Sequence, residues 1–273
     1  MSRMEVITLA DGPATAELAP GVESRVLATG SLGAVGLTTS LATFRPAAEL
    51  PYHLHPFSEV IVVLSGEALV QIEGRRYRLR PFDAMHVPAG TPHAVRNASS
   101  DRVAVLHSSF ASDAPTRELV SREFPIQDHD LTAPSGPENL VRFEAAPVYE
   151  LAPRAHFRDL FARRFGARGI CGGYGVFQPG ASLPCHYHAF DESITIVSGN
   201  AVCQVAGREY ALLDCATACV PRGQPHRFLN RSDQPMGMIW VYAGDEPQRT
   251  LVEAGFCEGT LNLATLGGDR AGN

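Results

Sequence analysis

Hydrophobic and polar residues follow one another in short runs along most of the chain. The runs at 60–64 (VIVVL), 68–74 (ALVQIEG) and 102–110 (RVAVLHSSF) are β-branched or alternating, and glycine, proline and asparagine separate them at close intervals. Short strands at such spacing favour an antiparallel sandwich or barrel. Helical periodicity is limited to two ambiguous pieces, 116–122 and 158–166. The pattern therefore predicts an all-β protein with few short helices.

The run at 60–64 is apolar at consecutive positions rather than at alternate ones. A strand of this kind is expected to be covered on both faces. Its outer face must then meet the other half of the chain or a second subunit. Because apolar outer faces of this kind suit pairing, we also expect a homodimer.

A long internal repeat organises the sequence. Residues 44–66 (FRPAAELPYHLHPFSEVIVVLSG) reappear at 177–199 (FQPGASLPCHYHAFDESITIVSG), an offset of 133 residues. The offset persists beyond both ends of this segment, until residues 113–120 match 245–252 after a slip of one position. We therefore expect two domains of one kind.

The repeat also sets the expected domain bounds. It places an N-terminal domain at 1–120, a linker rich in proline and aspartate at 121–138, and a C-terminal domain at 139–273. A chain of this length suffices for two small cores.

Composition excludes several kinds of function. All 23 basic side chains are arginines, so Schiff-base chemistry, lysine-bound pyridoxal phosphate and the P-loop lysine are ruled out. A net charge of -6 argues against nucleic acid and anionic membranes as partners. No apolar run approaches the roughly 20 residues that span a bilayer. The N-terminus resembles no signal peptide, and we expect a cytoplasmic protein.

The six cysteines all lie in the C-terminal half and include no CxxC pair. Their spacing matches no small disulfide scaffold. We expect them to be reduced and mostly buried. They are Cys171, Cys185, Cys203, Cys215, Cys219 and Cys257.

Histidines at equivalent places in the two repeats are the strongest chemical signal. In the first copy, the pattern His53-x-His55-x-x-x-Glu59 is followed by a distant His93. Residues two apart on a strand share a face, so the paired histidines can bind one ion, the glutamate can close on it, and the distant histidine can arrive from a neighbouring strand. The second copy repeats all four candidate ligands as His186, His188, Glu192 and His226.

These motifs resemble the two signature motifs of the cupin superfamily, and their duplication resembles a bicupin. The resemblance covers both repeats and implies two tandem double-stranded β-helix barrels of the jelly-roll type, each with one metal site. One departure is visible. The glycine that usually opens the second motif is Phe82 in one copy and Cys215 in the other, which puts a tight turn in doubt.

The ligand set constrains the metal and its chemistry. Three neutral histidines and one carboxylate leave a divalent ion with a net charge of about +1 and two open positions on an octahedral metal. This suits Fe, Mn, Ni or Co. Zinc is also possible, but a tetrahedral zinc would be closed by four ligands and structural. An anionic bidentate ligand, such as an enolate, a catechol-like diol, an α-keto acid or a dicarboxylate, alone or with dioxygen, fits the open positions.

The resemblance also ranks the possible substrates. Cupins with this ligand set include quercetin dioxygenases and oxalate-converting enzymes. Oxalate decarboxylases carry an arginine where this chain has Leu50 and Leu183, and gentisate-type dioxygenases lack the glutamate that is present here as Glu59 and Glu192. Apolar strand residues can turn inward and favour an enolic or aromatic substrate, although they can also be simple core. They are Phe44, Ile61 and Val63 in the first copy and Phe177, Ile194 and Ile196 in the second.

The two copies differ near the candidate ligands. His86 and His107 are weak candidates for a general base in the first copy, since a histidine titrates near neutrality. At the repeat offset their counterparts are Cys219 and Trp240. The alternative is a purely structural or surface position for both histidines.

Three functions remain open. The favoured one is a metal-dependent dioxygenase or related oxidoreductase acting on a small enolic or aromatic compound. The alternatives are a non-redox metal enzyme (an isomerase, decarboxylase or hydrolase) and a binding protein whose metals are structural.

Overall fold

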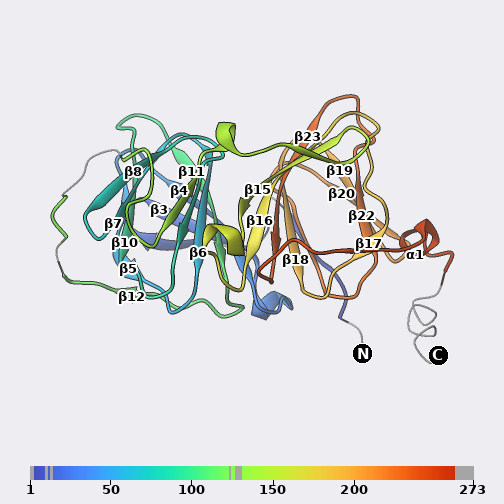
Figure 1. The fold of residues 1–273 in the computed structure, drawn as a ribbon, viewed down its shortest axis with the longest axis horizontal. Helices are drawn as coiled ribbons and strands as arrows, with labels where there is room; N and C mark the ends of the chain where they lie inside the picture. The colour runs from blue at the N-terminus through green and yellow to red at the C-terminus, as the bar shows by residue number, and fades with distance from the viewer. Residues whose placement is uncertain (1–2, 10–11, 13–14, 123, 127–130, 262–273) are drawn as a thin grey trace.

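The computed structural model describes residues 3–9, 12, 15–122, 124–126 and 131–261. Two β-barrels lie side by side in Figure 1, the first coloured blue to green and the second yellow to red. The described helical pieces are short: η1 (Gly30–Leu32), η2 (Phe143–Ala145), η3 (Arg163–Phe165) and α1 (Ala254–Glu258). No described helix is long and apolar enough to cross a bilayer. The predicted all-β architecture with few short helices is confirmed.

Each barrel is formed by two antiparallel sheets. Within the described chain, the larger sheet of the N-terminal barrel has the order β13 (Asn139–Val141), β9 (Ala84–Val87), β6 (Glu59–Ser65), β11 (Ala104–Phe110), β4 (Thr38–Phe44), β3 (Val22–Ala28) and β2 (Ala16–Ala19). Its smaller sheet has the order β12 (Glu118–Leu119), β5 (Glu49–Leu54), β10 (His93–Asn97), β7 (Ala68–Ile72) and β8 (Arg75–Leu79).

The C-terminal barrel repeats this arrangement strand for strand. Its larger sheet has the order β1 (Val6–Thr8), β21 (Thr217–Val220), β18 (Glu192–Ser198), β23 (Met236–Tyr242), β16 (Cys171–Phe177), β15 (Ala155–Phe161) and β14 (Tyr149–Ala152). Its smaller sheet has the order β20 (Arg208–Leu212), β19 (Ala201–Val205), β22 (His226–Leu229), β17 (His186–Tyr187) and β24 (Thr250–Leu251).

The first strand of each repeat pairs with the other repeat's barrel. Strand β1 is hydrogen-bonded to β21 of the C-terminal barrel, and β13 is hydrogen-bonded to β9 of the N-terminal barrel. The two strands occupy equivalent places in the repeat, so the exchange is reciprocal. Each exchanged strand therefore belongs to the barrel on the other side of the domain bounds expected near residues 120 and 139. Part of the expected linker, 127–130, lies outside the described residues.

A buried glutamate anchors each exchanged strand. Glu138, just before β13, accepts hydrogen bonds from Arg75 Nε at 2.7 Å and from the Tyr77 hydroxyl. In the other barrel Glu5 accepts equivalent bonds from Arg208, at 2.5 and 2.7 Å. Arg75 and Arg208 are therefore structural ion-pair partners of these glutamates.

Replacing Glu138 with glutamine is expected to lower the free energy of unfolding by about 2 kcal/mol at neutral pH. Burial raises the pKa of Glu138, but the bonds from Arg75 and Tyr77 outweigh this effect and hold the pKa below its ordinary value of 4.5. Because the folded-state pKa is the lower one, this stabilisation is present above the unfolded value and is lost as the pH falls through the folded value. Urea unfolding at pH 7 and at about pH 3.5 should show the difference shrinking in acid.

Glu67→Gln is the matched control for that measurement. Glu67 pairs with Arg78, but both side chains are about two-fifths exposed, at 42% and 39%. An exposed pair of this kind contributes little. An equal loss of stability in both variants would contradict the anchoring role of Glu138.

The two barrels pack against each other through an apolar layer. Val60 and Val62 of β6 are fully buried against Leu160, Ile239 and Val241 of the second repeat. The expectation that the run at 60–64 is covered on its outer face is confirmed, and the other half of the chain covers it. The homodimer stays a prediction.

The turns that lack the usual glycine form nonetheless. Phe82 and Cys215 both adopt left-handed backbone conformations, with φ of 66° and 60°. The Phe82 N–H donates to the Val63 carbonyl of β6 at 2.6 Å and the Cys215 N–H to the Ile196 carbonyl of β18 at 2.7 Å, so each turn is hydrogen-bonded to a neighbouring strand. A left-handed conformation is costly for these residues. The Phe82 ring also packs 4.9 Å from the ring of Tyr174, which contributes to offsetting that cost.

The expectation that the cysteines are all reduced is wrong for one pair. Cys185 and Cys257 form a disulfide that joins residues 72 positions apart. Cys185 directly precedes β17, and the chain after β24 returns to it, where the Val252 N–H donates to the Cys185 carbonyl at 3.0 Å. Sequence spacing alone cannot show this approach, because it depends on the closure of the barrel.

Candidate metal centres and the adjoining cavity

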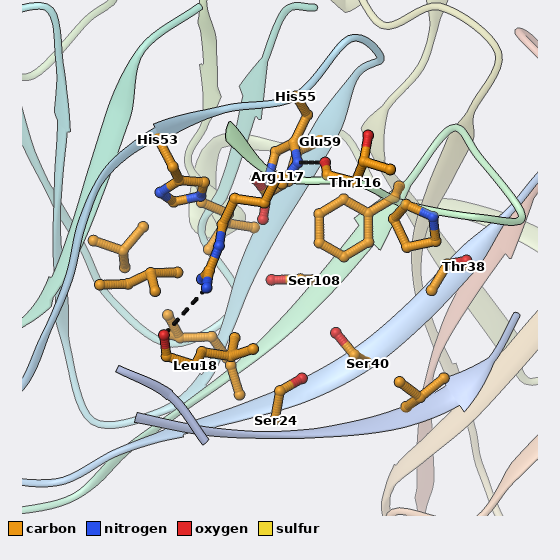
Figure 2. Close-up of a pocket in the computed structure, with 18 of the residues that line it drawn as sticks. Leu18, Ser24, Thr38, Ser40, His53, His55, Glu59, Ser108, Thr116 and Arg117 are labelled. Atoms are coloured by element: carbon orange, nitrogen blue, oxygen red, sulfur yellow. Dashed lines mark hydrogen bonds and ion pairs between the residues drawn. The ribbon is translucent and has the colours of Figure 1, made fainter. Parts of the chain in front are cut away.

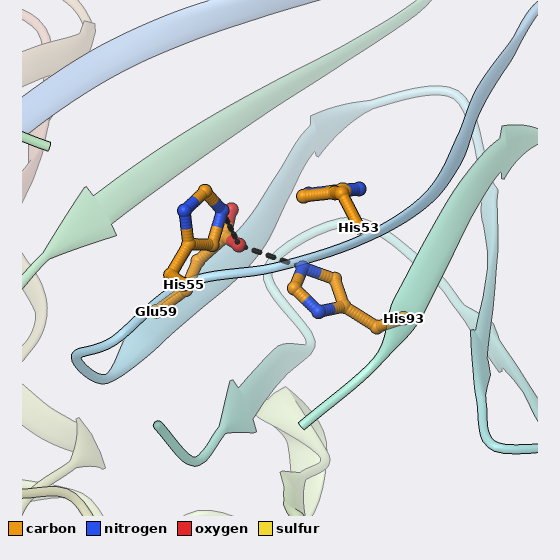
Figure 3. A group of neighbouring side chains, drawn as sticks. All are labelled: His53, His55, Glu59 and His93. Carbon is orange, nitrogen blue, oxygen red and sulfur yellow. Dashed lines mark hydrogen bonds and ion pairs between the residues drawn. The ribbon is translucent and has the colours of Figure 1, made fainter. Parts of the chain in front are cut away.

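The four predicted ligands of the first repeat meet inside the N-terminal barrel (Figure 3). His53 on β5 lies opposite His93 on β10 in the strand register. His55 follows the end of β5, and Glu59 opens β6. One potential ligand atom from each residue lies within 4.8 Å of all the others. The structure brings together the four side chains that the sequence predicts.

The second repeat builds the same cluster in the C-terminal barrel. His186 on β17 lies opposite His226 on β22, and Glu192 opens β18. With His188 they also lie within 4.8 Å of one another. All four side chains are buried.

Main-chain carbonyl groups orient the three histidines of each cluster. The Nδ1 atoms of His53, His55 and His93 lie 2.5 to 2.9 Å from the carbonyl oxygens of Pro51, Thr116 and Thr91. The Nδ1 atoms of His186, His188 and His226 lie 2.6 to 2.9 Å from those of Pro184, Gln248 and Gln224. A carbonyl oxygen only accepts, so each Nδ1 carries the proton and each Nε2 lone pair faces the cluster. Metal-binding histidines are typically oriented in this way.

The inward-facing atoms fit a bound cation. Glu59 Oε2 lies 2.9 Å from His93 Nε2 and 3.2 Å from His55 Nε2. A carboxylate and neutral imidazole nitrogens are all acceptors, so this convergence requires a proton or a metal ion between them. In the second cluster, the buried His188 Nε2 has no hydrogen-bond donor among the described residues. Three imidazoles and a carboxylate are a donor set for a divalent transition metal.

The charge states suit metal binding. Burial, and secondarily the neighbouring His93, lowers the pKa of His53 to about 3, so this ring is neutral at physiological pH. Burial raises the pKa of Glu59, but hydrogen bonds and charge from His55 and His93, when these rings are protonated, outweigh it and hold that pKa well below its ordinary value. A bound metal would replace the protons that these rings share with the carboxylate. A neutral imidazole and an ionised carboxylate are the forms that coordinate a metal.

The N-terminal cluster opens into a cavity of about 330 Å³ (Figure 2). His53, His55 and Glu59 form part of its wall. The predicted apolar residues Phe44 and Ile61 line it, whereas Val63 packs in the barrel core. The remaining lining residues are Leu18, Ser24, Val26, Thr38, Ser40, Ala42, Leu50, Val95, Leu106, Ser108, Phe110, Pro115, Thr116 and Arg117.

The cavity of the C-terminal barrel is placed differently relative to its cluster. Its cavity of about 300 Å³ has none of the four ligands in its lining. The strand registers show that Phe157 replaces Ser24 and that Trp240 replaces Ser108. Phe177, Ile194 and Ile196 are core residues of this barrel.

Glycines on β16 make room for these aromatic side chains. A Cβ atom on Gly175 would lie 2.7 Å from Phe157 Cε1, and one on Gly173 would lie 2.9 Å from Trp240 Cζ2. The equivalent residues in the first barrel are Ala42 and Ser40. The rings of Phe157 and Trp240 therefore occupy, in the C-terminal barrel, the space that stays open in the N-terminal barrel.

The structure does not support the weak catalytic candidates His86 and His107. Neither lines the cavity. Because side chains alternate along a strand, both point out of the barrel: His86 Nε2 lies 3.2 Å from Ser58 Oγ, and His107 Nε2 lies 3.2 Å from Thr195 Oγ1 of the other repeat. Burial lowers the pKa of each to about 4. They are neutral structural residues near the junction of the barrels.

The assignment of Trp240 as the counterpart of His107 is also corrected. His107 lies opposite Val62, and the equivalent residue opposite Thr195 is Ile239. The chain is one residue longer from Asn97 to Ala104 than from the equivalent Asn230 to Met236, which shifts the repeat offset before the last long strand. Cys219 remains the counterpart of His86.

Sequence reasoning missed the polar side chains of the cavity. Ser24, Ser40 and Ser108 lie on three neighbouring strands, and Arg117 lies on the segment that crosses the cavity. Only the match of 113–120 with 245–252 could have drawn attention to Arg117, because it retains an arginine in both copies.

Comparison with known proteins agrees with this fold and site. A family model described as cupin domain matches residues 40–109 and 173–242. The protein named polyketide synthase CurC from Streptomyces cyaneus is 30% identical over 105 residues, which are 38% of this chain and 68% of that protein. Quercetin 2,3-dioxygenase from Bacillus subtilis is 29% identical over 102 residues, 37% of this chain but only 30% of that enzyme.

A solved structure extends the similarity to the whole fold. Oxalate decarboxylase from Bacillus subtilis superimposes with a TM-score of 0.73 at 16% identity, covering 92% of this chain and 79% of that one. At that identity the likeness shows the fold alone. With two matched domains, each holding a three-histidine and glutamate cluster, the chain belongs to the cupin domain family and is a bicupin.

Proposed function

We propose that this protein is a metal-dependent oxygenase whose N-terminal barrel acts on a small enolic or aromatic compound. One observation carries the proposal: of the two ligand clusters, the N-terminal one lines a cavity, whereas the cavity of the C-terminal barrel stops short of its ligands. The C-terminal metal would then stabilise its barrel.

The nature of the cavity supports this substrate class. Its volume of about 330 Å³ is at the low end of the range for small-molecule sites, roughly 300–1,000 Å³. Phe44, Leu50 and Ile61 offer an apolar wall that suits a ring. The similarity to a quercetin dioxygenase and to a polyketide synthase protein supports the same class, since both names refer to oxygen-rich carbon skeletons.

The chain's own residues have defined tasks in this proposal. His53, His55, Glu59 and His93 would hold a divalent transition metal, which supplies Lewis acidity and, if redox-active, electron transfer to dioxygen. The apolar wall orients the ring and excludes water. Glu59 is the only carboxylate in the described lining, so it is the group able to take a proton from an enolic substrate.

A non-redox enzyme is the alternative that the same cluster allows, because a Lewis-acidic metal also serves isomerisation or decarboxylation. Similarity of fold to oxalate decarboxylase does not favour oxalate itself. Leu50 lines this cavity at the position where oxalate decarboxylases are expected to carry an arginine. The requirement for dioxygen separates the two proposals.

Dioxygen uptake by the metal-loaded protein is the direct test. Protein loaded separately with Fe(II), Mn(II), Co(II) or Ni(II) is expected to consume dioxygen in proportion to loss of an enolic or catecholic substrate, and protein loaded with Zn(II) is not. An oxygen electrode and chromatography of the substrate measure both quantities. Substrate loss under argon would favour the non-redox alternative. No turnover with any of these metals would favour a binding protein.

A further inference from the structure

A short segment lies across the N-terminal cavity and brings an arginine beside the ligand cluster. The Thr116 carbonyl accepts the His55 Nδ1–H bond at 2.5 Å, and the next residue, Arg117, donates from Nη2 to the Leu18 carbonyl at 3.1 Å. Immediately after it, β12 pairs with β5 in a register that places Leu119 opposite His53. The segment is thus held on both sides of the cavity, as Figure 2 shows, and the exposed Arg117 lies at the rim of the cavity.

The charge of Arg117 is not neutralised by a described carboxylate. Within the described chain, its hydrogen-bond partner is the Leu18 carbonyl, and Glu59 is the only acid among the residues that line the same cavity. A guanidinium has five N–H donors in a planar fork that matches a carboxylate. Together with a divalent metal and one glutamate, Arg117 leaves the cavity with a net charge of about +2.

The sheet that carries Phe44 and Ile61 also presents serine hydroxyls that can solvate a charged group. Ser24, Ser40 and Ser108 come from β3, β4 and β11, where Ser108 lies directly opposite Ser40 in the register. The hydroxyls of these three serines have no protein partner among the described residues. They are available to a ligand or to water, which lowers the cost of placing an anion in this cavity.

We propose that the N-terminal cavity selects ring compounds that carry an anionic group in addition to their metal-binding oxygens, and that Arg117 recognises this group. The inference rests on the proposed function for the place of the substrate, and it names the substrate class more closely. The C-terminal barrel provides the contrast. Its equivalent arginine, Arg249, lines a cavity together with Phe157 and Trp240, and none of the four ligands is in that lining.

Binding of two matched probes tests the proposal on the full chain loaded with Ni(II) under argon, because an octahedral metal keeps open positions for the diol and argon excludes oxygen chemistry. 6,7-Dihydroxy-2-naphthoic acid and 2,3-dihydroxynaphthalene share the metal-binding diol and differ by one carboxylate. Titration calorimetry should show the acid binding at least about tenfold more tightly to the unmodified protein. Arg117→Gln is expected to remove that preference. The affinity for the acid should fall by about 10- to 100-fold, and the affinity for the neutral diol should stay unchanged.

Arg249→Gln is the matched control and should change neither affinity. Arg117→Lys should restore part of the preference, because it keeps the charge but loses the planar fork. Two metals per chain and an unchanged melting curve establish that each variant is folded. Three results would overturn the inference: Arg117→Gln keeps the preference for the acid, it loses the same affinity for both probes, or the unmodified protein binds neither probe.

The outcomes separate this inference from the proposed function. If Arg117→Gln loses the preference but no redox metal supports dioxygen uptake, the proposed ligand class is supported and the proposed oxygenase function is not. If dioxygen uptake occurs and Arg117→Gln turns over acids and neutral diols with unchanged KM, the oxygenase stands and the role of Arg117 does not.

Discussion

His53→Ala is expected to lower turnover by at least about 100-fold, whereas His186→Ala should leave most of it. Removing a residue that only hydrogen-bonds to a metal ligand commonly lowers metal affinity or activity by about 10- to 100-fold, and these variants remove a ligand itself. Both variants should lose one of two metals, because the two clusters have the same donors. Of these two histidines, only His53 lines one of the two cavities, so we expect the large loss of turnover in His53→Ala alone.

Metal analysis and thermal unfolding accompany this comparison. His186→Ala should unfold at a lower temperature than the parent protein, since a metal that binds only the folded state stabilises it. Its turnover is therefore measured well below that temperature. Equal retention of activity in both variants would show that the metals only organise the barrels. Greater loss in His186→Ala would place the reaction in the C-terminal barrel.

Ser108→Trp should abolish ligand binding and turnover while leaving both metals in place. This change copies the C-terminal barrel, in which Trp240 occupies the equivalent position opposite Gly173. Ser108 lies opposite Ser40 and lines the N-terminal cavity, so the indole would occupy the space above the ligand cluster. We expect affinity for 2,3-dihydroxynaphthalene to fall by more than about 100-fold, because a ring site that is filled cannot bury the ring.

The reciprocal variant Trp240→Ser is the control. It should lower the free energy of unfolding by about 3–5 kcal/mol through the cavity that it leaves in the C-terminal barrel. Turnover should change little, because the substrate site lies in the other barrel. Metal content measured by plasma emission, calorimetry with the diol and urea unfolding provide the readouts. Normal ligand binding by a folded Ser108→Trp protein would contradict the assignment of the cavity.

The metal ligands could be predicted because their geometry is set by nearby residues. His53 and His55 are two positions apart at the end of one strand, and a short turn brings Glu59 back beside them. The distant His93 required a neighbouring strand, and the repeat pointed to it by showing the same spacing twice.

Side chains whose direction depends on register could not be placed in the same way. A shift of one residue turns a strand residue from the inside of a barrel to the outside. His107 points at Thr195 of the other repeat, whereas its neighbour Ser108 lines the cavity. The sequence showed that a slip occurs before 113–120, but not where, so the counterpart of His107 was misassigned by one position.

The amino-acid sequence by itself determined the duplicated all-β architecture and the two ligand clusters, because period-two strands, turns and short ligand spacings are local properties repeated at a constant offset. Tertiary structure alone decided three things that depend on contacts between distant segments. It exchanged the strands anchored by Glu5 and Glu138, joined Cys185 to Cys257, and filled one barrel with aromatic rings. It thereby left an open cavity beside only one of the two described clusters, which distinguishes two sites with identical ligands.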